Sequence, residues 1–365
     1  MRPLVDAAFW RGRAVLITGH TGFKGAWLAL WLSAMGARVT GLAPRPPTSP
    51  SLYALAAVGD GLAEVAADVR DFAAVREAVD RHAPEVVFHL AAQPLVRRSL
   101  IDPRTTYETN VMGTVNVLEA VRTAPSVRAV VTVTSDKCYA NRDDGRPFVE
   151  EDRLGGHDPY SSSKACAELV ADAYRSSFFA AGGPEGGTLR LASARAGNVI
   201  GGGDWGQDRL IPDLVRGALA GRAVPIRHPD AVRPWQHVLN PLSGYLRLAQ
   251  AVWDDPGLQG GWNFGPPDQE ARPVRWIVAR LSERWPGGLR VELDPGPHPR
   301  EAHLLSLDST KARERLGWSP TWSLEEALDA VVAWYDGLRA GEDVRALTLA
   351  QIEAFAGSAS VASGR

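Results

Sequence analysis

Two groups of residues have types and spacing suited to redox and acid–base chemistry. Ser135, Asp136 and Lys137 directly follow an apolar segment that predicts a strand, and Tyr160 and Lys164 come later in the chain. Residues four apart lie on one face of a helix, so Tyr160 and Lys164 are expected side by side. A hydroxyl, a carboxylate and an amine at a strand's carboxyl end lie where open α/β sheets bind ligands. These residue types predict a dehydrogenase-like site with an added acid and base, as a dehydratase needs.

A glycine-rich turn between an apolar strand and an apolar helix predicts a dinucleotide site. The turn reads Gly19-His-Thr-Gly22-Phe-Lys-Gly25 and follows the segment 14–18. Glycines let the backbone approach a pyrophosphate, and the helix N-terminus supplies N–H groups and a positive dipole. The spacing is one residue longer than GxGxxG, a variant typical of short-chain dehydrogenases.

The position that selects between NAD and NADP, at the end of the second predicted strand, holds an arginine instead of an acidic residue. The acidic residue expected for the adenosine ribose is missing, since no Asp or Glu lies between His20 and Gly59. Arg45 stands at the end of the second predicted strand, where an arginine can accept a 2′-phosphate. A solvated loop arginine is an equally good interpretation. We expect NAD, with NADP as the alternative, and we expect Asp68 to reach the adenine.

The pattern of elements predicts an α/β fold with a doubly wound parallel sheet. Short apolar strands alternate with amphipathic helices up to residue 179, as in βαβ units. After Gly187 the segments become short and rich in Pro and Trp. We expect a Rossmann domain over 1–187 that carries the catalytic residues, a substrate lobe over 188–356 with segments returning to the first domain, and a disordered tail over 357–365.

Composition and charge narrow the functional class. A formal net charge of −2 provides no basic field for nucleic acid or for a membrane surface. The N-terminus has no apolar core long enough for a signal peptide. Cys138 and Cys166 have neither CxxC nor metal-ligand spacing, which favours a reducing cytoplasm and gives no reason to expect a metal. A cytoplasmic enzyme acting on a small molecule is therefore expected.

Long strings of residues make the resemblance specific. They include TGHTGFKGAWLALWL from Thr18, TSDKCY from Thr134, DPYSSSKACAEL from Asp158 and RAGNVIGGGDW from Arg195. With these strings the chain resembles the CDP-glucose branch of the nucleotide-sugar 4,6-dehydratases, a group of extended short-chain dehydrogenases. The resemblance runs almost the full length. It departs at Arg45, where that group usually has Asp, and this puts only the cofactor's 2′ position in doubt.

The resemblance implies a reaction and a role for each catalytic residue. CDP-D-glucose would lose water to give CDP-4-dehydro-6-deoxy-D-glucose, with bound NAD taking a hydride from C4 and returning it to C6. Tyr160, with its pKa lowered by Lys164, would accept the 4-hydroxyl proton, and Ser135 would hydrogen-bond the 4-oxygen. Asp136 would protonate the departing 6-oxygen. Lys137 would remove the C5 proton, although it could instead pair with Asp136 or with a substrate phosphate.

The remaining expected ligands fall into two sets. Besides Tyr160 and Lys164, the residues expected to bind the cofactor are Gly19, Thr21, Gly22, Phe23, Lys24, Gly25, Arg45, Asp68, Val69, Leu90, Ala91, Ala92, Asn110 and Thr134. Those expected to bind the nucleotide sugar are Gln93, Arg97, Asn198, Arg209, Leu210, Arg233, His298, Arg300 and His303.

Other interpretations of the same residues stay open. A nucleotide-sugar 4-epimerase or decarboxylase would need Tyr160 and Lys164 but no acid–base pair beside Ser135. A cofactor-sensing regulator with this fold usually lacks the Tyr or the Lys, and this chain has both. In the short-chain dehydrogenases, the counterparts of helices 107–122 and 159–179 form a dimer interface, which implies a homodimer here.

Overall fold

The structure is a computed structural model that describes residues 4–141, 144–179, 189–294, 296 and 305–362. Its main sheet has seven strands in the order β11-β6-β5-β4-β1-β2-β3, and every neighbouring pair is parallel. This topology confirms the predicted doubly wound α/β class. The strands are β1 (Ala14–Thr18), β2 (Arg38–Leu42), β3 (Ala63–Val65), β4 (Val86–His89), β5 (Ala129–Val133), β6 (Arg190–Arg195) and β11 (Gly260–Asn263).

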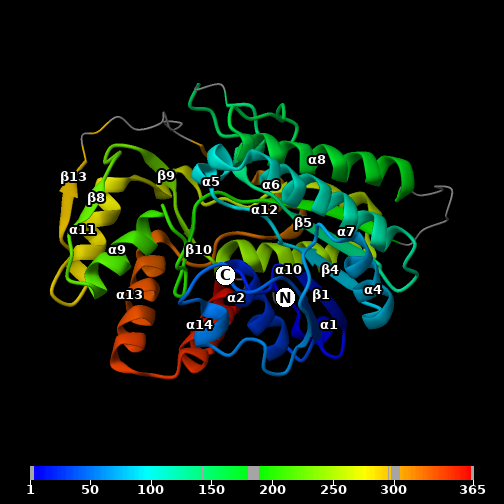
Figure 1. Cartoon of the computed structure of the whole chain (residues 1–365), viewed down its shortest axis with the longest axis horizontal. Helices are drawn as coiled ribbons and strands as arrows, with labels where there is room; N and C mark the ends of the chain where they lie inside the picture. Colours follow the sequence, from blue (N-terminus) through cyan, green and yellow to red (C-terminus); the bar gives the residue numbers. More distant parts are fainter. Residues whose placement is uncertain (1–3, 142–143, 180–188, 295, 297–304, 363–365) are drawn as a thin grey trace.

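Helices cover both faces of this sheet, as an all-parallel sheet requires. Figure 1 shows α7 and α8 on one side, and α2 and α10 on the other. Successive residues of β1 divide between the two cores: Val15 and Ile17 pack on the α2 side, and Leu16 packs on the α7 side. Side chains alternate along a strand, so a strand buried on both faces is apolar throughout. The layer helices are α2 (Phe23–Ala34), α4 (Phe72–His82), α7 (Gly113–Arg122), α8 (Pro159–Phe178) and α10 (Leu239–Asp254).

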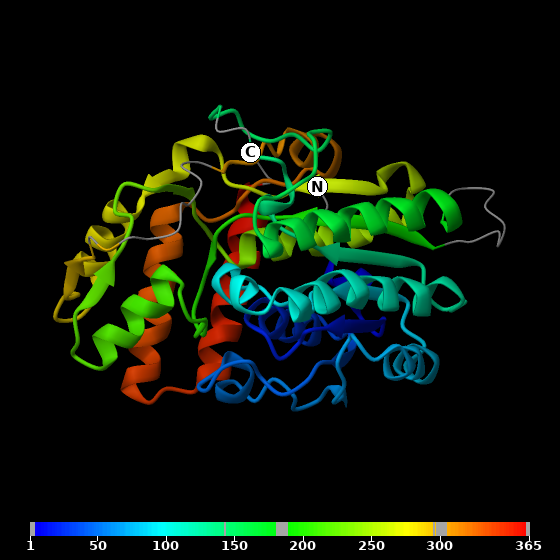
Figure 2. The same cartoon turned by 45° about the horizontal axis from the view of Figure 1, so that its top comes forward.

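A smaller lobe lies beside the carboxyl edge of the sheet. Figures 1 and 2 show β8, β13, α9 and α11 gathered at one end of the molecule. β13 pairs with β8 in parallel, and β12 pairs with β9 in antiparallel orientation. The elements of this region are α9 (Leu210–Leu219), β8 (Val224–Ile226), β9 (Val232–Pro234), β12 (Ala271–Pro273), α11 (Val274–Arg284) and β13 (Val291–Leu293).

The chain crosses repeatedly between these two parts. β6 and β11 both belong to the main sheet, and α10 packs beneath β5 and β6, although all three lie beyond residue 187. Short elements complete the path: α1 (Ala7–Trp10), α3 (Leu52–Leu55), α5 (Val96–Ile101), α6 (Pro103–Tyr107), β7 (Val199–Ile200), β10 (Gln236–His237), α12 (Thr310–Leu316), α13 (Leu324–Ala340) and α14 (Val344–Ala362).

Two segments differ from the sequence-based expectation. The helix expected over 107–122 is divided, because a π-helical turn, Glu108–Met112, separates α6 from α7. The tail expected to be disordered from 357 begins inside α14, which continues to Ala362. Alanine is the best helix former, so an alanine-rich end can extend a helix that is already anchored. In the part of the chain that the structure describes, no helix is long and apolar enough to cross a membrane.

Candidate active site

The glycine turn has the geometry of a dinucleotide cradle. Gly19 has a φ of +79°, and a Cβ there would lie 2.7 Å from the backbone nitrogen of Ala91. A Cβ on Gly25 would lie 2.2 Å from the carbonyl oxygen of Gly19. Gly22 is the N-cap of α2 and offers no side-chain cap to the first turn. The helix N-terminus therefore keeps backbone N–H groups for a pyrophosphate, and the residues present fit NAD.

The end of β4 and the turn are tied together by buried hydrogen bonds. The backbone nitrogens of Leu90 and Ala91 donate to the carbonyl and hydroxyl oxygens of Thr18, at 3.1 and 3.3 Å. His89 Nδ1 lies 2.7 Å from the Thr18 hydroxyl. Burial lowers the pKa of His89 to about 3, with Lys164 adding to the effect, so His89 is neutral. Ala92 follows in the same loop, and Thr21 donates to the carbonyl of Pro44 at 3.2 Å.

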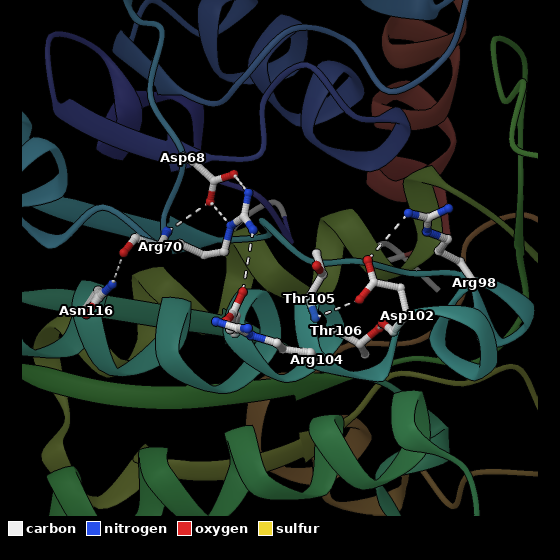
Figure 3. Close-up of polar contacts among 9 residues, drawn as sticks. Asp68, Arg70, Arg98, Asp102, Arg104, Thr105, Thr106 and Asn116 are labelled. Carbon is white, nitrogen blue, oxygen red and sulfur yellow. Dashed lines mark hydrogen bonds and ion pairs between the residues drawn. The ribbon is translucent and has the colours of Figure 1, made fainter.

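The expected adenine ligand is engaged by a neighbour. Figure 3 shows the Asp68 carboxylate turned toward Arg70, whose Nε and Nη2 donate to it at 3.0 and 2.8 Å. The side-chain hydrogen bond from Arg70 is the main reason why the pKa of Asp68 lies below its usual value. Oδ1 also accepts from Arg70 N at 2.9 Å, so it is Oδ2 that keeps a further lone pair for an adenine amino group. Val69 is buried against Gly113, and Asn116 donates to its carbonyl at 2.8 Å.

Asn110 and Gln93 fix the loop beside the site. The Asn110 amide donates to Ser163 Oγ at 2.8 Å and to the Gln93 carbonyl at 3.1 Å, and its oxygen accepts from Gln93 N. The side chain of Gln93 donates to Thr106 and accepts from Leu95 N within its own loop. The structure therefore shows Gln93 in a loop-fixing position, while its role toward the sugar stays a prediction.

The turn that carries Ser135, Asp136 and Lys137, three of the expected catalytic residues, begins at the carboxyl end of β5 and is called the catalytic turn below. Ser135 is the N-cap of a 3₁₀ turn, Asp136–Cys138, and its hydroxyl accepts from Lys137 N at 3.2 Å. The same hydroxyl donates to Asp136 Oδ1 at 2.8 Å. Asp136 is 3 % exposed, and its Oδ2 has no hydrogen-bond partner among the described residues. This buried oxygen is available to a bound substrate. Lys137, the next residue, is half-buried.

Tyr160 and Lys164 lie on α8 against this turn. The Lys164 ammonium donates to the carbonyl of Val133, at the end of β5, at 3.2 Å. Burial lowers the pKa of Lys164 to about 8. Burial also raises the pKa of Tyr160 to about 12, against the opposite effect of its hydrogen bond with Ser135. This direction differs from the expectation of a lowered tyrosine pKa, because loss of solvation outweighs the favourable contacts.

Lys24, in the first turn of α2, lies close enough to Asp136 and Lys164 for their charges to act on it. Burial lowers the pKa of Lys24 to about 7, helped by the positive charges of Arg209 and Lys164 and opposed by Asp136 and Asp204. The ring of Phe23, the residue before Lys24, lies close to Gly201. The sequence placed Lys24 with the cofactor, but its electrostatic link to Asp136 and Arg209 depends on the fold.

Of the residues expected to bind the nucleotide sugar, Arg209 acts electrostatically on the catalytic residues, and Arg97 is linked to the second lobe. Arg209 donates to Asp204 Oδ2 at 3.1 Å, and its charge acts on both Lys24 and Tyr160. Arg97 forms an ion pair with Asp208 at 3.4 Å. Half-buried Asn198 and Leu210 follow β6 and begin α9, respectively.

The structure gives less support for the other expected ligands. Arg233 is buried in β9 and donates to the Val232 carbonyl at 2.8 Å. Arg45 is exposed, and we find no hydrogen bond or ion pair of its side chain among the described residues. His298, Arg300 and His303 lie outside the described residues. The described part of the chain holds no group of three or more His, Cys, Asp or Glu residues that could bind a metal.

Glu168 and Arg195 are buried beneath the turn and were not predicted from the sequence. Arg195 Nη2 lies 2.7 Å from Glu168 Oε2. A signal was present, because Glu168 follows Lys164 by one helical turn and Arg195 ends a strand that also contains Leu191, Ala192 and Ala194. Buried charges need partners, so these two charges predict a pair.

Comparisons with known proteins identify the family. The family model described as "NAD dependent epimerase/dehydratase family" matches residues 15–258. The chain belongs to the NAD dependent epimerase/dehydratase family. This match confirms both the expected cofactor, NAD, and the resemblance to short-chain dehydrogenases acting on nucleotide sugars.

Three relatives show how far the likeness extends within this family. The chain is 49% identical over 342 residues to a CDP-glucose 4,6-dehydratase of Salmonella typhimurium, covering 93% of this chain and 95% of the other. It is 27% identical to a dTDP-glucose 4,6-dehydratase of Xanthomonas campestris, covering 88% and 92%. The solved UDP-glucose 4-epimerase of Thermus thermophilus in complex with NAD has a TM-score of 0.74 and 25% identity, covering 88% and 99%.

The lowered pKa of Lys24 predicts an unusual dependence of stability on pH. Between pH 7 and its ordinary pKa of 10.5, the unfolded chain holds a Lys24 proton that the folded chain has released, so the stability contributed by this site rises with pH. Below pH 7 the full cost of burying the charge is present. We expect Lys24→Met to melt at a higher temperature than the unsubstituted, ligand-free protein below pH 7.

The gap in melting temperature should narrow as the pH rises above 7. Calorimetry across this range measures it, with roughly 2–4 °C expected for each kcal/mol of relieved burial cost. A gap that stays constant with pH would contradict the lowered pKa.

Proposed function

We propose that this chain converts CDP-D-glucose to CDP-4-dehydro-6-deoxy-D-glucose and water. The observation that carries this proposal is the acid–base turn, Ser135–Lys137, packed against Tyr160 and Lys164 at the carboxyl edge of the sheet. An epimerase of the same fold needs Tyr160 and Lys164 but no proton donor and base for elimination. The 49% identity to a CDP-glucose 4,6-dehydratase supports the same reaction.

The cofactor would be held by the glycine turn, Asp68, Asn110 and Lys164. When bound, NAD would supply an acceptor for the hydride that leaves C4 of the sugar and is returned to C6, so the reaction needs no external oxidant. Lys164, charged below its pKa of about 8, would hold the ribose next to the nicotinamide. Arg45 is exposed and takes no part in these contacts, and the support for NAD comes from the family model.

The chain's own residues would manage the protons. Tyr160 accepts the proton of the 4-hydroxyl in its phenolate form, which burial, raising its pKa to about 12, opposes and which the hydrogen bond with Ser135 and the charge of Arg209 favour. Ser135 hydrogen-bonds the 4-oxygen as negative charge develops there. Asp136 donates a proton to the departing 6-oxygen through Oδ2, the buried oxygen without a protein partner among the described residues. Lys137 removes the proton from C5.

The arginines around the cleft would bind the diphosphate and ribose. Arg209 is already charged beside Asp204 and acts electrostatically on Tyr160. Arg97 reaches toward the second lobe through Asp208. An arginine's planar fork matches phosphate oxygens, so both can exchange a carboxylate partner for a substrate phosphate.

The preferred nucleotide is the first prediction for this activity. We expect kcat/KM for CDP-glucose to exceed by far the values for dTDP-, UDP- and GDP-glucose, because the specific strings around Ser135–Lys137 match the CDP-glucose group. The alkaline absorbance of the 4-keto product measures all four rates. Equal rates with dTDP-glucose would overturn the choice of nucleotide but leave a dehydratase.

The role of Lys137 is the second prediction. Removing a general base costs roughly 10²–10⁴-fold in rate, so Lys137→Ala should lose turnover by that factor. CDP-glucose should still bind, because Tyr160, Lys164 and the arginines remain. In deuterated water the unsubstituted enzyme should place deuterium at C5 of the product.

Near-normal turnover and C5 labelling by Lys137→Ala would show that another group takes the proton. Lys24, with a pKa of about 7, is then the next amine to replace. Lys24→Met is the substitution matched to Lys137→Ala, since it removes a second amine near Asp136 and leaves the Ser135–Lys137 turn intact.

We propose that the protein is a homodimer through helices 107–122 and 159–179. The support is exposed apolar surface on these segments: Tyr107 is 37%, Met112 51% and Leu169 57% exposed. Large apolar side chains gathered on a helix pair are typical of a protein–protein interface. The cytoplasmic location also remains a proposal, and it accords with Cys138 and Cys166 being free thiols.

The dimer can be tested by charging that surface. Met112→Lys combined with Leu169→Glu should shift the molar mass from dimer to monomer in sedimentation or light-scattering measurements. Leu219→Glu is the matched control, because Leu219 is 44% exposed on α9 and lies outside these helices. A monomeric unsubstituted protein at micromolar concentration would contradict the proposal.

A further inference from the structure

A buried ion pair lies directly beneath the catalytic turn. Glu168, on α8, is 3% exposed and pairs at 2.7 Å with Arg195, the last residue of β6, which is 5% exposed. Taking two charges out of water is costly unless their remaining hydrogen-bonding groups are also satisfied. Glu168 accepts further hydrogen bonds from Thr134 and, at 2.6 Å, from Ser193.

The other end of the pair reaches the far side of the same turn. Arg195 Nη1 donates to the Tyr139 hydroxyl at 2.7 Å and to the Glu150 carbonyl at 3.0 Å. The Tyr139 hydroxyl in turn donates to Asn263 Oδ1 at 2.7 Å, at the end of β11. Thr134 directly precedes the Ser135–Cys138 turn and Tyr139 directly follows it. One ion pair therefore holds both flanks of the turn.

The pair also acts on the lysine of the redox half of the site. Burial acts to raise the pKa of Glu168, but Arg195 and the hydrogen bonds outweigh it, so Glu168 stays ionised. Its charge opposes the loss of positive charge on Lys164, whose pKa burial lowers to about 8. The pair is thus linked electrostatically to α8 and mechanically to the turn.

We propose that Glu168 and Arg195 are positioning residues that hold the Ser135–Lys137 turn in register with Tyr160 and Lys164. This inference rests on the proposed dehydration. Oxidation at C4 depends on the α8 residues, whereas loss of water depends on the turn. Loosening one flank of the turn should slow elimination more than oxidation, so that the two halves of the reaction become uncoupled.

Tyr139→Phe tests the flank after the turn. The substitution removes the hydroxyl between Arg195 and Asn263 and keeps the ring, which stacks on Phe148 at a centroid distance of 4.8 Å. Small misplacements of reacting groups can cost roughly 10²-fold, so kcat should fall toward that factor while KM for CDP-glucose changes little. Deuterium incorporation at C5 should slow, and reduced cofactor should accumulate during turnover, visible by its near-ultraviolet absorbance.

Tyr174→Phe is the matched control. It removes another tyrosine hydroxyl of α8, which donates to Glu119 on α7 at 3.2 Å. This variant should keep normal kcat and show no accumulation of reduced cofactor. The thermal melting of both variants shows whether the fold is intact.

Two substitutions at Thr134 test the flank before the turn, because the Thr134 hydroxyl, expected from the sequence to bind the cofactor, donates to Glu168 in the structure. Thr134→Val removes the hydroxyl that donates to Glu168 and should behave like Tyr139→Phe, whereas Thr134→Ser keeps that hydroxyl and should restore elimination. Glu168→Gln should also move the alkaline limit of the kcat profile to lower pH, because the charge supporting Lys164 is lost. These readouts respond to position and charge and not merely to stability.

The outcomes separate this inference from the proposed function. If the unsubstituted protein does not turn over CDP-glucose, the function is wrong. If it does, and Tyr139→Phe and Thr134→Val keep normal kcat without reduced cofactor accumulating, the positioning role is wrong. A uniform loss of both half-reactions that follows the melting temperature would likewise overturn it. If Tyr139→Phe does not fold, the Thr134 pair decides.

Discussion

The single direction of all seven main strands is the constraint on which this molecule depends. Parallel strands are joined by crossover helices, so both faces must be covered and each strand must be apolar on both sides. The carboxyl ends of β1, β4, β5 and β6 then meet at one edge. The glycine turn, the Ala91 loop, the catalytic turn and Asn198 each follow one of these ends. The candidate functional residues lie together at this edge because the loops that carry them follow strands that end there.

The elements with strong local signals could be predicted from the sequence. β1 was predicted with the bounds that the structure shows, because an apolar run followed by a glycine turn marks it clearly. α10 was missed because it is buried almost all round and contains Pro241 and Gly244, which indicate a loop. Its helical structure comes from packing beneath β5 and β6, and this long-range contact leaves no periodic pattern.

The site could be predicted in composition but only partly in its electrostatics. Residue types and spacing located Ser135–Lys137, Tyr160 and Lys164. The fold was needed to see that burial raises the pKa of Tyr160 and that the charge of Asp136 acts on Lys24. Such effects arise between residues that are distant in sequence, and their sign depends on how much solvation is lost. Spacing alone contains no information on either quantity.

The π-helical turn between α6 and α7 changes the phase of a helix. An α-helix advances about 100° per residue, so one residue added to a turn rotates everything after it. Within the π-helical turn, Asn110 faces Gln93 and Ser163; after it, Val117 and Val121 belong to the core on this side of the sheet. A continuous α-helix could satisfy one of these two orientations at a time. Site geometry and core packing are therefore set by a single inserted residue, and removing it would force the helix to give up one of them.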